Sequence, residues 1–150
     1  MGRVVSIVKV ENERVLAAVR RALALCEGLE KIEPGSTVLL KPNLVKPSAS
    51  GSGTITDARV TEAVATAVLE RNPGRVIIGE GSSIGYDFPG RVDSLTAMEA
   101  SGTADVARAL DLEMVDLNQD ERVEVHAEDA FLMDTFGVAR TAWEADFVID

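Results

Sequence analysis

The sequence has one cysteine, one histidine and one tryptophan, and each scarcity excludes a class of site. Cys26 alone forms no internal disulfide and cannot by itself hold zinc or an iron–sulfur cluster. It falls on an apolar stripe with helical spacing, so we interpret it as a small buried hydrophobic residue. His126 alternates with Val123 and Val125 in a strand-like segment, which predicts a solvated side chain. Histidine-based nucleophilic catalysis therefore has almost no support, and we assign no catalytic residue.

Basic residues are also few relative to acidic ones. The chain carries 15 Lys and Arg against 25 Asp and Glu, a formal net charge of −10. Binding to nucleic acid or to an anionic membrane depends on basic side chains that neutralise phosphates, so we expect neither partner. The sequence contains no long apolar run and no signal-peptide pattern, so we expect a cytoplasmic protein. Its oligomeric state stays open.

The apolar content is sufficient for one ordinary core. With 150 residues, 46% of them hydrophobic, the chain predicts a single α/β domain over residues 1–150. Strand-like and helix-like segments alternate, which predicts a three-layer α/β fold with a mostly parallel, Rossmann-like sheet. The expected strands are residues 4–10, 37–41, 75–80, 113–117 and 146–150. The expected helices are residues 11–28, 56–72, 92–100 and 104–110, with Thr56 as the cap of the second, and a glycine-punctuated loop runs from residue 81 to 89.

The segment after residue 120 breaks this alternation. Residues 122–127 and 135–140 predict a C-terminal antiparallel excursion, followed by a capped helical turn at residues 141–144 in which Trp143 packs on the sheet. The chain stops within an apolar run, so we expect an N-terminal fragment of a longer protein. If the final strand lies beside residues 37–41, opposite residues 75–80, the strand order reverses at Lys41.

The most informative stretch is the strand end at Lys41-Pro42-Asn43. Pro42 ends the strand and restricts Lys41 to an extended conformation, at the edge where open α/β sheets bind ligands. A Ser/Gly-rich loop then leads to the start of the next helix, where free N–H groups favour an anion. The residues expected around a phosphate or carboxylate are Lys41, Asn43, Lys46, Thr54 and Thr56. The alternative is structural: Lys41 extends its stem to solvent, Asn43 holds a turn and Thr56 only caps.

Acidic strand ends allow a second kind of site. Glu80, Asp116 and Asp150 each follow or end a predicted strand, and hard oxygen ligands of this type suit magnesium or calcium. Separate solvated or salt-bridged carboxylates are the commoner arrangement on an acidic protein, so we predict no metal site. The glycines at 79, 81 and 85 resemble a dinucleotide fingerprint, but no helix follows at once and this is not the first strand–helix unit.

Four pieces of the sequence, in their order and spacing, resemble family 362 of the domains of unknown function. They are LLKPNL at 39–44, TITD at 54–57, VIIGEGS at 76–82 and ADFVI at 145–149. The resemblance covers essentially the whole chain, and Glu80 and Ser82 match family positions, which adds both to the expected ligand-binding residues. The family is prokaryotic, biochemically uncharacterised and often joined to ferredoxin-like iron–sulfur segments. In the family the last strand continues into a Lys-Thr-His segment that this chain lacks. The resemblance therefore implies, as an alternative to an anion site, a non-catalytic accessory domain of a redox protein whose iron–sulfur cluster lies in a downstream region. No cofactor is expected within this chain.

Overall fold

The structure of the protein is a computed structural model that describes residues 4–83 and 93–150. Most of the loop expected at residues 81–89, and the expected helix start at 92, lie outside the described residues. The helices are α1 (Val15–Leu25), α2 (Ala58–Leu69), α4 (Ser94–Ser101), α5 (Thr103–Ala109) and α6 (Arg140–Glu144). The strands are β1 (Thr37–Leu40), β2 (Arg75–Glu80), β3 (Glu113–Asp116), β4 (Arg122–His126), β5 (Thr135–Ala139) and β6 (Phe147–Ile149).

The main sheet has four parallel strands in the order β3-β2-β1-β6. The chain moves outward from β1 through β2 to β3 and then returns to place β6 on the other side of β1. Leu40 therefore pairs with Ile78 on one side and with Ile149 on the other. The predicted reversal of strand order at the end of β1 is confirmed, and such a reversal opens a crevice at the carboxyl ends of the strands.

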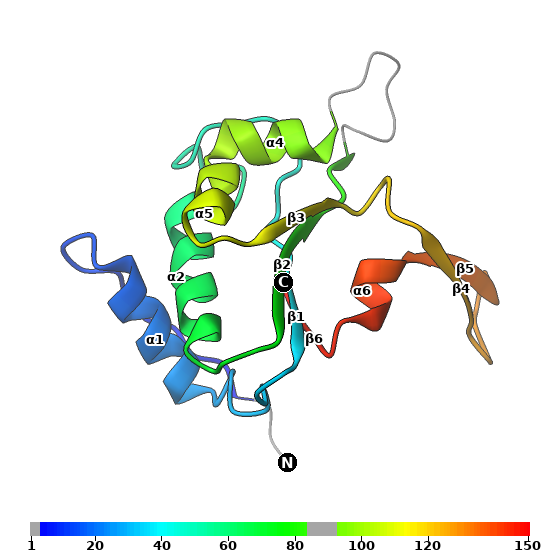
Figure 1. The fold of residues 1–150 in the computed structure, drawn as a ribbon, viewed down its shortest axis with the longest axis horizontal. Helices are drawn as coiled ribbons and strands as arrows, with labels where there is room; N and C mark the ends of the chain where they lie inside the picture. Colours follow the sequence, from blue (N-terminus) through cyan, green and yellow to red (C-terminus); the bar gives the residue numbers. More distant parts are fainter. Residues whose placement is uncertain (1–3, 84–92) are drawn as a thin grey trace.

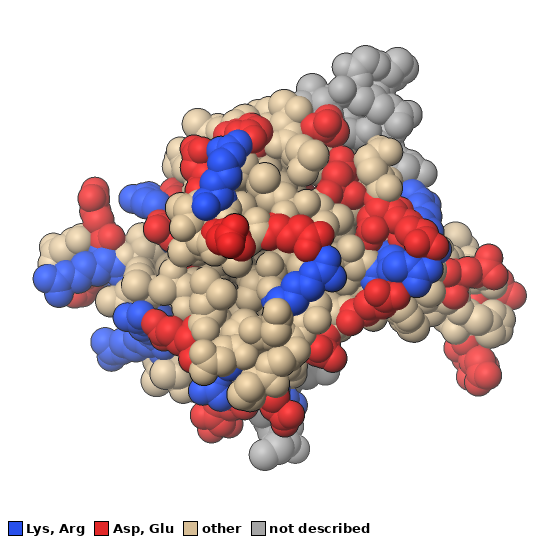
Figure 2. All heavy atoms as spheres, viewed as in Figure 1, with Lys and Arg blue, Asp and Glu red and all other residues tan. Residues whose placement is uncertain are grey.

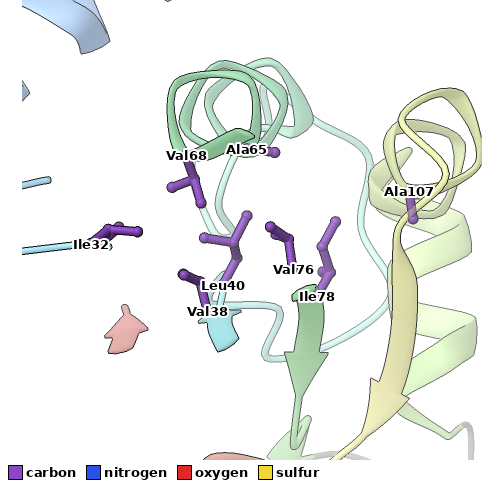
Figure 3. Packing of buried hydrophobic residues seen from close by; sticks show 8 residues of the cluster. All are labelled: Ile32, Val38, Leu40, Ala65, Val68, Val76, Ile78 and Ala107. Carbon is purple, nitrogen blue, oxygen red and sulfur yellow. The ribbon is translucent and has the colours of Figure 1, made fainter. Parts of the chain in front are cut away.

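Helices lie on both faces of this sheet, as the predicted α/β fold requires. In Figure 1, α1, α2, α4 and α5 lie on one side of the sheet and α6 on the other. Alternate residues of β1 and β2 face α2 and α5, and Figure 3 shows their side chains meeting in one cluster. That cluster comprises Ile32, Val38, Leu40, Ala65, Val68, Val76, Ile78 and Ala107. Leu39 and Ile77, the intervening residues, are also fully buried, so the sheet is covered on both faces.

The expected antiparallel excursion is a two-stranded ribbon of β4 and β5. Figure 1 shows it projecting from the body of the domain, beyond α6. Its register places Val125 opposite Phe136 and Val123 opposite Val138, so one face of the ribbon is apolar. His126 is exposed at its end, as its alternation with valines predicts.

Some local predictions are wrong. Residues 4–10 form no strand, because the extended segment pairs with no strand among the described residues, and Val5 and Ile7 are exposed. The cap of α2 is Asp57, whose Oδ1 accepts from the Arg59 amide at 3.0 Å.

Three further predictions, on the last helical turn, on Trp143 and on Cys26, also need correction. The turn at 141–144 begins one residue early, at Arg140, and its Thr141 amide donates to Asp120 Oδ2 at 2.7 Å instead of being part of a capping box. Trp143 is 54% exposed and not buried against the sheet, and Cys26 is half-buried and not fully buried.

Candidate functional site

Lys41 lies at the reversal of strand order, between the ends of β2 and β6. Its amide donates to the Ile149 carbonyl at 2.8 Å, which continues the pairing of β1 with β6 for one residue. Its ammonium Nζ lies 2.7 Å from Asp150 Oδ1 and 3.7 Å from Glu80 Oε2. Parallel strands end at a common edge, and this geometry brings together three side chains that the sequence singled out.

The two carboxylates around Lys41 have different environments. The side chain of Asp150 is 73% exposed, whereas that of Glu80 is 8% exposed. Glu80 Oε1 accepts from the Gly81 amide at 3.0 Å, and Oε2 is buried with no hydrogen-bond partner among the described residues. Glu80 is therefore a fixed neighbour of Lys41, and Asp150 is one that solvent or a ligand can replace.

Burial and charge act in opposite directions on these groups. Burial raises the pKa of Glu80 above its ordinary value, although the Lys41 charge and the amides of Leu44 and Gly81 oppose the rise. Burial alone would lower the pKa of Lys41, but the hydrogen bond with Asp150 and the charges of Glu80 and Asp150 outweigh it, so the Lys41 pKa is raised. Lys41 is thus a firmly charged ammonium at neutral pH.

A cavity of about 260 Å³ adjoins Lys41. Most of its wall is apolar, formed by Leu40, Pro42, Val60, Val64 and Ile149. Lys41, Thr56, Thr61 and Asp150 supply the polar part of the wall. The Thr61 hydroxyl is buried and has no hydrogen-bond partner among the described residues, which is unusual for a buried polar group. The cavity therefore combines a mostly apolar interior with a single cation.

Asn43 and Thr56 fix the loop that borders this cavity. The Asn43 amide donates to Thr56 Oγ1 at 2.9 Å, and the Thr56 amide donates to the Asn43 carbonyl at 2.9 Å. These two bonds close the loop of residues 43–56 at its base. Thr56 also lines the cavity, whereas the Asn43 side chain is exposed and is not part of the wall.

The start of α2 offers no free amide to an anion. The Ala58 amide donates to Ser50 Oγ at 2.8 Å, the Arg59 amide to Asp57 Oδ1 at 3.0 Å and the Val60 amide to the Asp57 carbonyl at 2.9 Å. These amides are already bonded within the chain, so the expected contribution of this helix end to an anion site stays a prediction that these bonds do not favour. Lys46 and Thr54 are exposed in the loop, and neither lines the cavity.

Ser82 belongs to a separate buried network. Its amide donates to Ser94 Oγ at 3.0 Å, Ser94 Oγ donates to Asp116 Oδ1 at 2.7 Å, and Asn118 Nδ2 donates to the Ser82 carbonyl at 2.9 Å. The Ser82 hydroxyl donates to the Leu44 carbonyl. Ser82 and Asp116 thus tie the end of β2 to α4 and β3, and Asp116 does not join Glu80 and Asp150 at Lys41.

Sequence reasoning missed the apolar wall and Thr61. The spacing of Val60 and Val64 indicates only the apolar face of a helix, and a threonine within that helix carries no signal of its own. Within residues 4–83 and 93–150, no group of three or more His, Cys, Asp or Glu side chains is placed to hold a metal ion. No helix in the described part of the chain is long and apolar enough to cross a membrane.

Charge is distributed without a basic patch on the face that Figure 2 shows. Lys and Arg side chains there are scattered among more numerous acidic ones. Several of the ion pairs among the described residues join side chains about half exposed to solvent, such as Arg75 with Glu113. The Lys41 ammonium is distinguished by its contact with a buried carboxylate.

Comparison with known proteins gives a family and one distant relative. The family model described as "Domain of unknown function (DUF362)" matches residues 38–150, which include every residue of the cavity wall. A thylakoid-associated protein of Synechocystis sp. is 28% identical over 141 residues, which cover 93% of this chain and 40% of that relative. The chain thus spans less than half the length of that relative. The relative is named as thylakoid-associated, so the cytoplasmic location expected for this chain stays a prediction. No solved structure matches.

Proposed function

We propose that this chain, which belongs to the DUF362 family, binds a small organic anion at the carboxyl ends of β1 and β6. The anionic group pairs with Lys41, and the apolar part of the ligand occupies the adjoining cavity. One observation carries the proposal: the Lys41 ammonium lines an apolar cavity and is held there by one buried and one exposed carboxylate.

The exposed carboxylate determines how an anion reaches Lys41. An ion pair with a solvent-exposed partner contributes only about 0–1 kcal/mol, so replacing Asp150 with the carboxylate or phosphate of a ligand costs little. Glu80 stays in place because it is buried and accepts the Gly81 amide. In this exchange Asp150 holds the ammonium until a ligand arrives, and Glu80 keeps it positioned afterwards.

The apolar wall determines which anions bind well. Burying apolar surface contributes roughly 25 cal/mol per Å², a gain that is absent for inorganic phosphate and available to a carboxylate with an alkyl chain. A ligand hydroxyl or carbonyl close to Thr61 would also provide a partner for this buried hydroxyl, which has none among residues 4–83 and 93–150. We therefore expect an amphipathic carboxylate or phosphate ester to bind more tightly than a bare inorganic anion.

The test compares hexanoate, acetate, inorganic phosphate and hexanol by chemical-shift titration of the ¹⁵N-labelled chain. Hexanoate should bind most tightly, with shifts at Val60, Val64 and Ile149. Lys41→Met should weaken hexanoate by about tenfold, the factor that ~1.4 kcal/mol represents, and leave the weak binding of hexanol unchanged. Lys31→Met, a change of an exposed lysine outside the cavity wall, is the matched control.

Two results would overturn the proposal. One is an absence of shifts at the cavity residues with all four compounds. The other is an equal loss of hexanoate binding in Lys41→Met and Lys31→Met, since a general loss of positive charge would then explain the effect.

The accessory role in an iron–sulfur redox protein stays a prediction from the family resemblance. The described residues contain no group that could hold a cluster. The ligands of such a cluster would therefore come from residues outside the described part of this chain. The visible absorbance of the intact natural protein, purified without oxygen, tests this role. A colourless protein without iron would contradict it.

A further inference from the structure

The outer edge of β5 has no partner among the described residues. The Ala127 amide donates to the Asp134 carbonyl at 2.7 Å, and the Arg140 amide to the Glu121 carbonyl at 2.6 Å. Hydrogen-bonded pairs alternate along an antiparallel ladder, so residues 136 and 138 bond to β4, and Thr135, Gly137 and Ala139 direct their backbone groups away from it. The edge therefore presents a row of free donors and acceptors.

This edge carries none of the features that normally prevent strand pairing. Natural proteins protect edges with charged side chains, prolines or bulges. The sequence of β5 is Thr-Phe-Gly-Val-Ala, without charge or proline, and Phe136 is 41% exposed. The adjoining tip of the ribbon is apolar as well, with Phe131 98% exposed and Leu132 88% exposed. An isolated two-stranded ribbon of this kind is only marginally stable, and additional strands stabilise it.

We propose that a second copy of this chain pairs with β5 through this edge. The two β5 strands would run antiparallel about a two-fold axis at Gly137, forming a four-stranded sheet with the order β4-β5-β5-β4. In this register Gly137 lies opposite the partner's Gly137, and Thr135 opposite the partner's Ala139, so the outward backbone groups of both copies meet. Phe136 lies opposite the partner's Val138, an apolar cross-strand pair.

Charge favours a second β5 over the other candidate occupants. Pairing through β4 about its central residue would place Glu124 opposite Glu124 of the partner, a destabilising contact between like charges. An anionic membrane at the ribbon tip is disfavoured by the exposed Glu128, Asp129 and Asp134 that flank the apolar residues. The uncharged β5 sequence is free of both conflicts.

The association should be weak and should strengthen with salt. Pairing through two strands of five residues each is a small contact beside the roughly 1,200 Å² that a stable interface buries. Each copy carries a formal net charge of −10, and this repulsion is screened by added salt, whereas backbone hydrogen bonds are little affected. We therefore expect a dimer that appears with rising protein concentration and is more populated at high salt.

Trp143 supplies an internal reporter of this association. It is the sole tryptophan of the chain, is 54% exposed and lies in α6, which follows β5 directly. Antiparallel pairing brings the ribbon tip of each copy toward the end of β5 and the start of α6 in the partner. Burial by the partner's Phe131 and Leu132 should shift the tryptophan emission to shorter wavelength as the dimer forms.

The decisive experiment uses the position on the two-fold axis. The three atoms nearest to a Cβ added at Gly137 all belong to the Arg122 side chain, the closest at 3.2 Å, so a substitution there requires that side chain to shift by a few tenths of an ångström. Gly137→Lys and Gly137→Glu each place like charges opposite each other, and each variant alone should sediment as a monomer. An equimolar mixture should restore the dimer, because lysine then lies opposite glutamate. Gly137→Ser, which keeps the backbone and adds no charge, should dimerise as the parent does.

Circular dichroism checks that every variant is folded. The proposal fails if the parent chain stays monomeric at all concentrations and salt levels, or if the charge variants dimerise as well alone as in the mixture. It also fails if the parent is monomeric yet floats with neutral phosphatidylcholine vesicles, which would make the ribbon tip a lipid-binding loop.

Discussion

Asp150 Oδ1 lies 2.7 Å from Lys41 Nζ, so an exposed ion pair joins the carboxyl ends of β6 and β1 at the entrance of an apolar cavity. The chain thus places its own carboxylate where the proposed ligand would place one. The Asp150 carboxylate and the ligand compete for a single ammonium. Substitutions of Lys41 and of Asp150 should therefore change the affinity for the ligand in opposite directions.

Asp150→Asn should raise the affinity for hexanoate. The substitution keeps the size of the side chain and removes the charge that competes for Lys41, while the buried Glu80 still positions the ammonium. We expect a gain of severalfold in affinity, with a change in unfolding free energy below about 1 kcal/mol because the side chain is exposed. The titration used for Lys41→Met measures the first quantity and urea unfolding the second. Weaker binding in Asp150→Asn would show that Asp150 contacts the ligand favourably.

The unfolding free energy of Glu80→Gln, relative to that of the parent protein, should increase as the pH rises. The pKa of Glu80 in the folded state is raised above the ordinary 4.5, so the folded state holds this proton more tightly than the unfolded state. The stability that this group contributes is fully present below the unfolded pKa and is lost as the pH rises through the folded pKa. Glutamine does not titrate, and the variant avoids that loss.

Urea unfolding from pH 4 to 7 measures the difference between Glu80→Gln and the parent. The difference in unfolding free energy should increasingly favour the variant as the pH rises. It should level off above the raised pKa of Glu80. Asp93→Asn is the control with the opposite sign, since bonds from the Thr96 amide and hydroxyl lower the Asp93 pKa. A difference for Glu80→Gln that moves against the variant with rising pH would show that Lys41 outweighs burial at this carboxylate.

Thr56→Val should loosen the loop at residues 43–56 without unfolding the domain. The substitution keeps the shape of the side chain and removes the oxygen that accepts from the Asn43 amide at 2.9 Å. An unpaired buried amide costs about 1–3 kcal/mol, and an exposed one regains water at less cost. Hydrogen exchange of the Asn43 amide should accelerate, while exchange of the core amides of Leu39 and Ile77 should change little. Equal acceleration at all three amides would indicate global destabilisation.

Gly74→Ala should be strongly destabilising. A Cβ at Gly74 would lie 2.5 Å from the backbone carbonyl oxygen of Gly35, and backbone hydrogen bonds from the Gly35 amide to Asn72 and from the Gly74 amide to Ser36 link the turns before β1 and β2. The clash requires the two turns to separate, for which we expect a loss of about 1–3 kcal/mol, the range of overpacking. Thermal unfolding measures the loss. Gly28→Ala, where the nearest atom is the flexible Leu23 side chain at 3.1 Å, should cost less.

The parallel sheet and the position of Lys41 were accessible from the sequence, because both follow from local patterns. Continuous apolar runs indicate strands covered on both faces, and Pro42 ends one of them immediately after a lysine. The convergence of Lys41, Glu80 and Asp150 also follows from the common direction of parallel strands. The same reasoning failed for residues 4–10, since β-branched composition identifies an extended segment but does not supply a partner strand.

The remainder of the site depends on packing between distant segments. Thr56 and Asp57 are adjacent and both suit a helix cap, and only the path of the loop decides that Asp57 caps α2 while Thr56 binds Asn43. The Thr61 hydroxyl, which has no hydrogen-bond partner in the described part of the chain, has no sequence signal, because its significance comes from a cavity wall that also needs the distant Ile149.

The pairing of β1 with β6 also determines when the cavity exists. These strands are far apart in the chain, and the bond from the Thr37 amide to Asp146 at their base spans 109 residues. A ribosome that has synthesised β1, α2 and β2 has therefore produced Lys41 and most of the apolar wall, but not Ile149 or Asp150. Contacts of such long range form late, after the local helices and hairpins. A bound ligand would consequently distinguish a finished domain from a nascent one, and occupancy of the cavity would coincide with closure of the sheet.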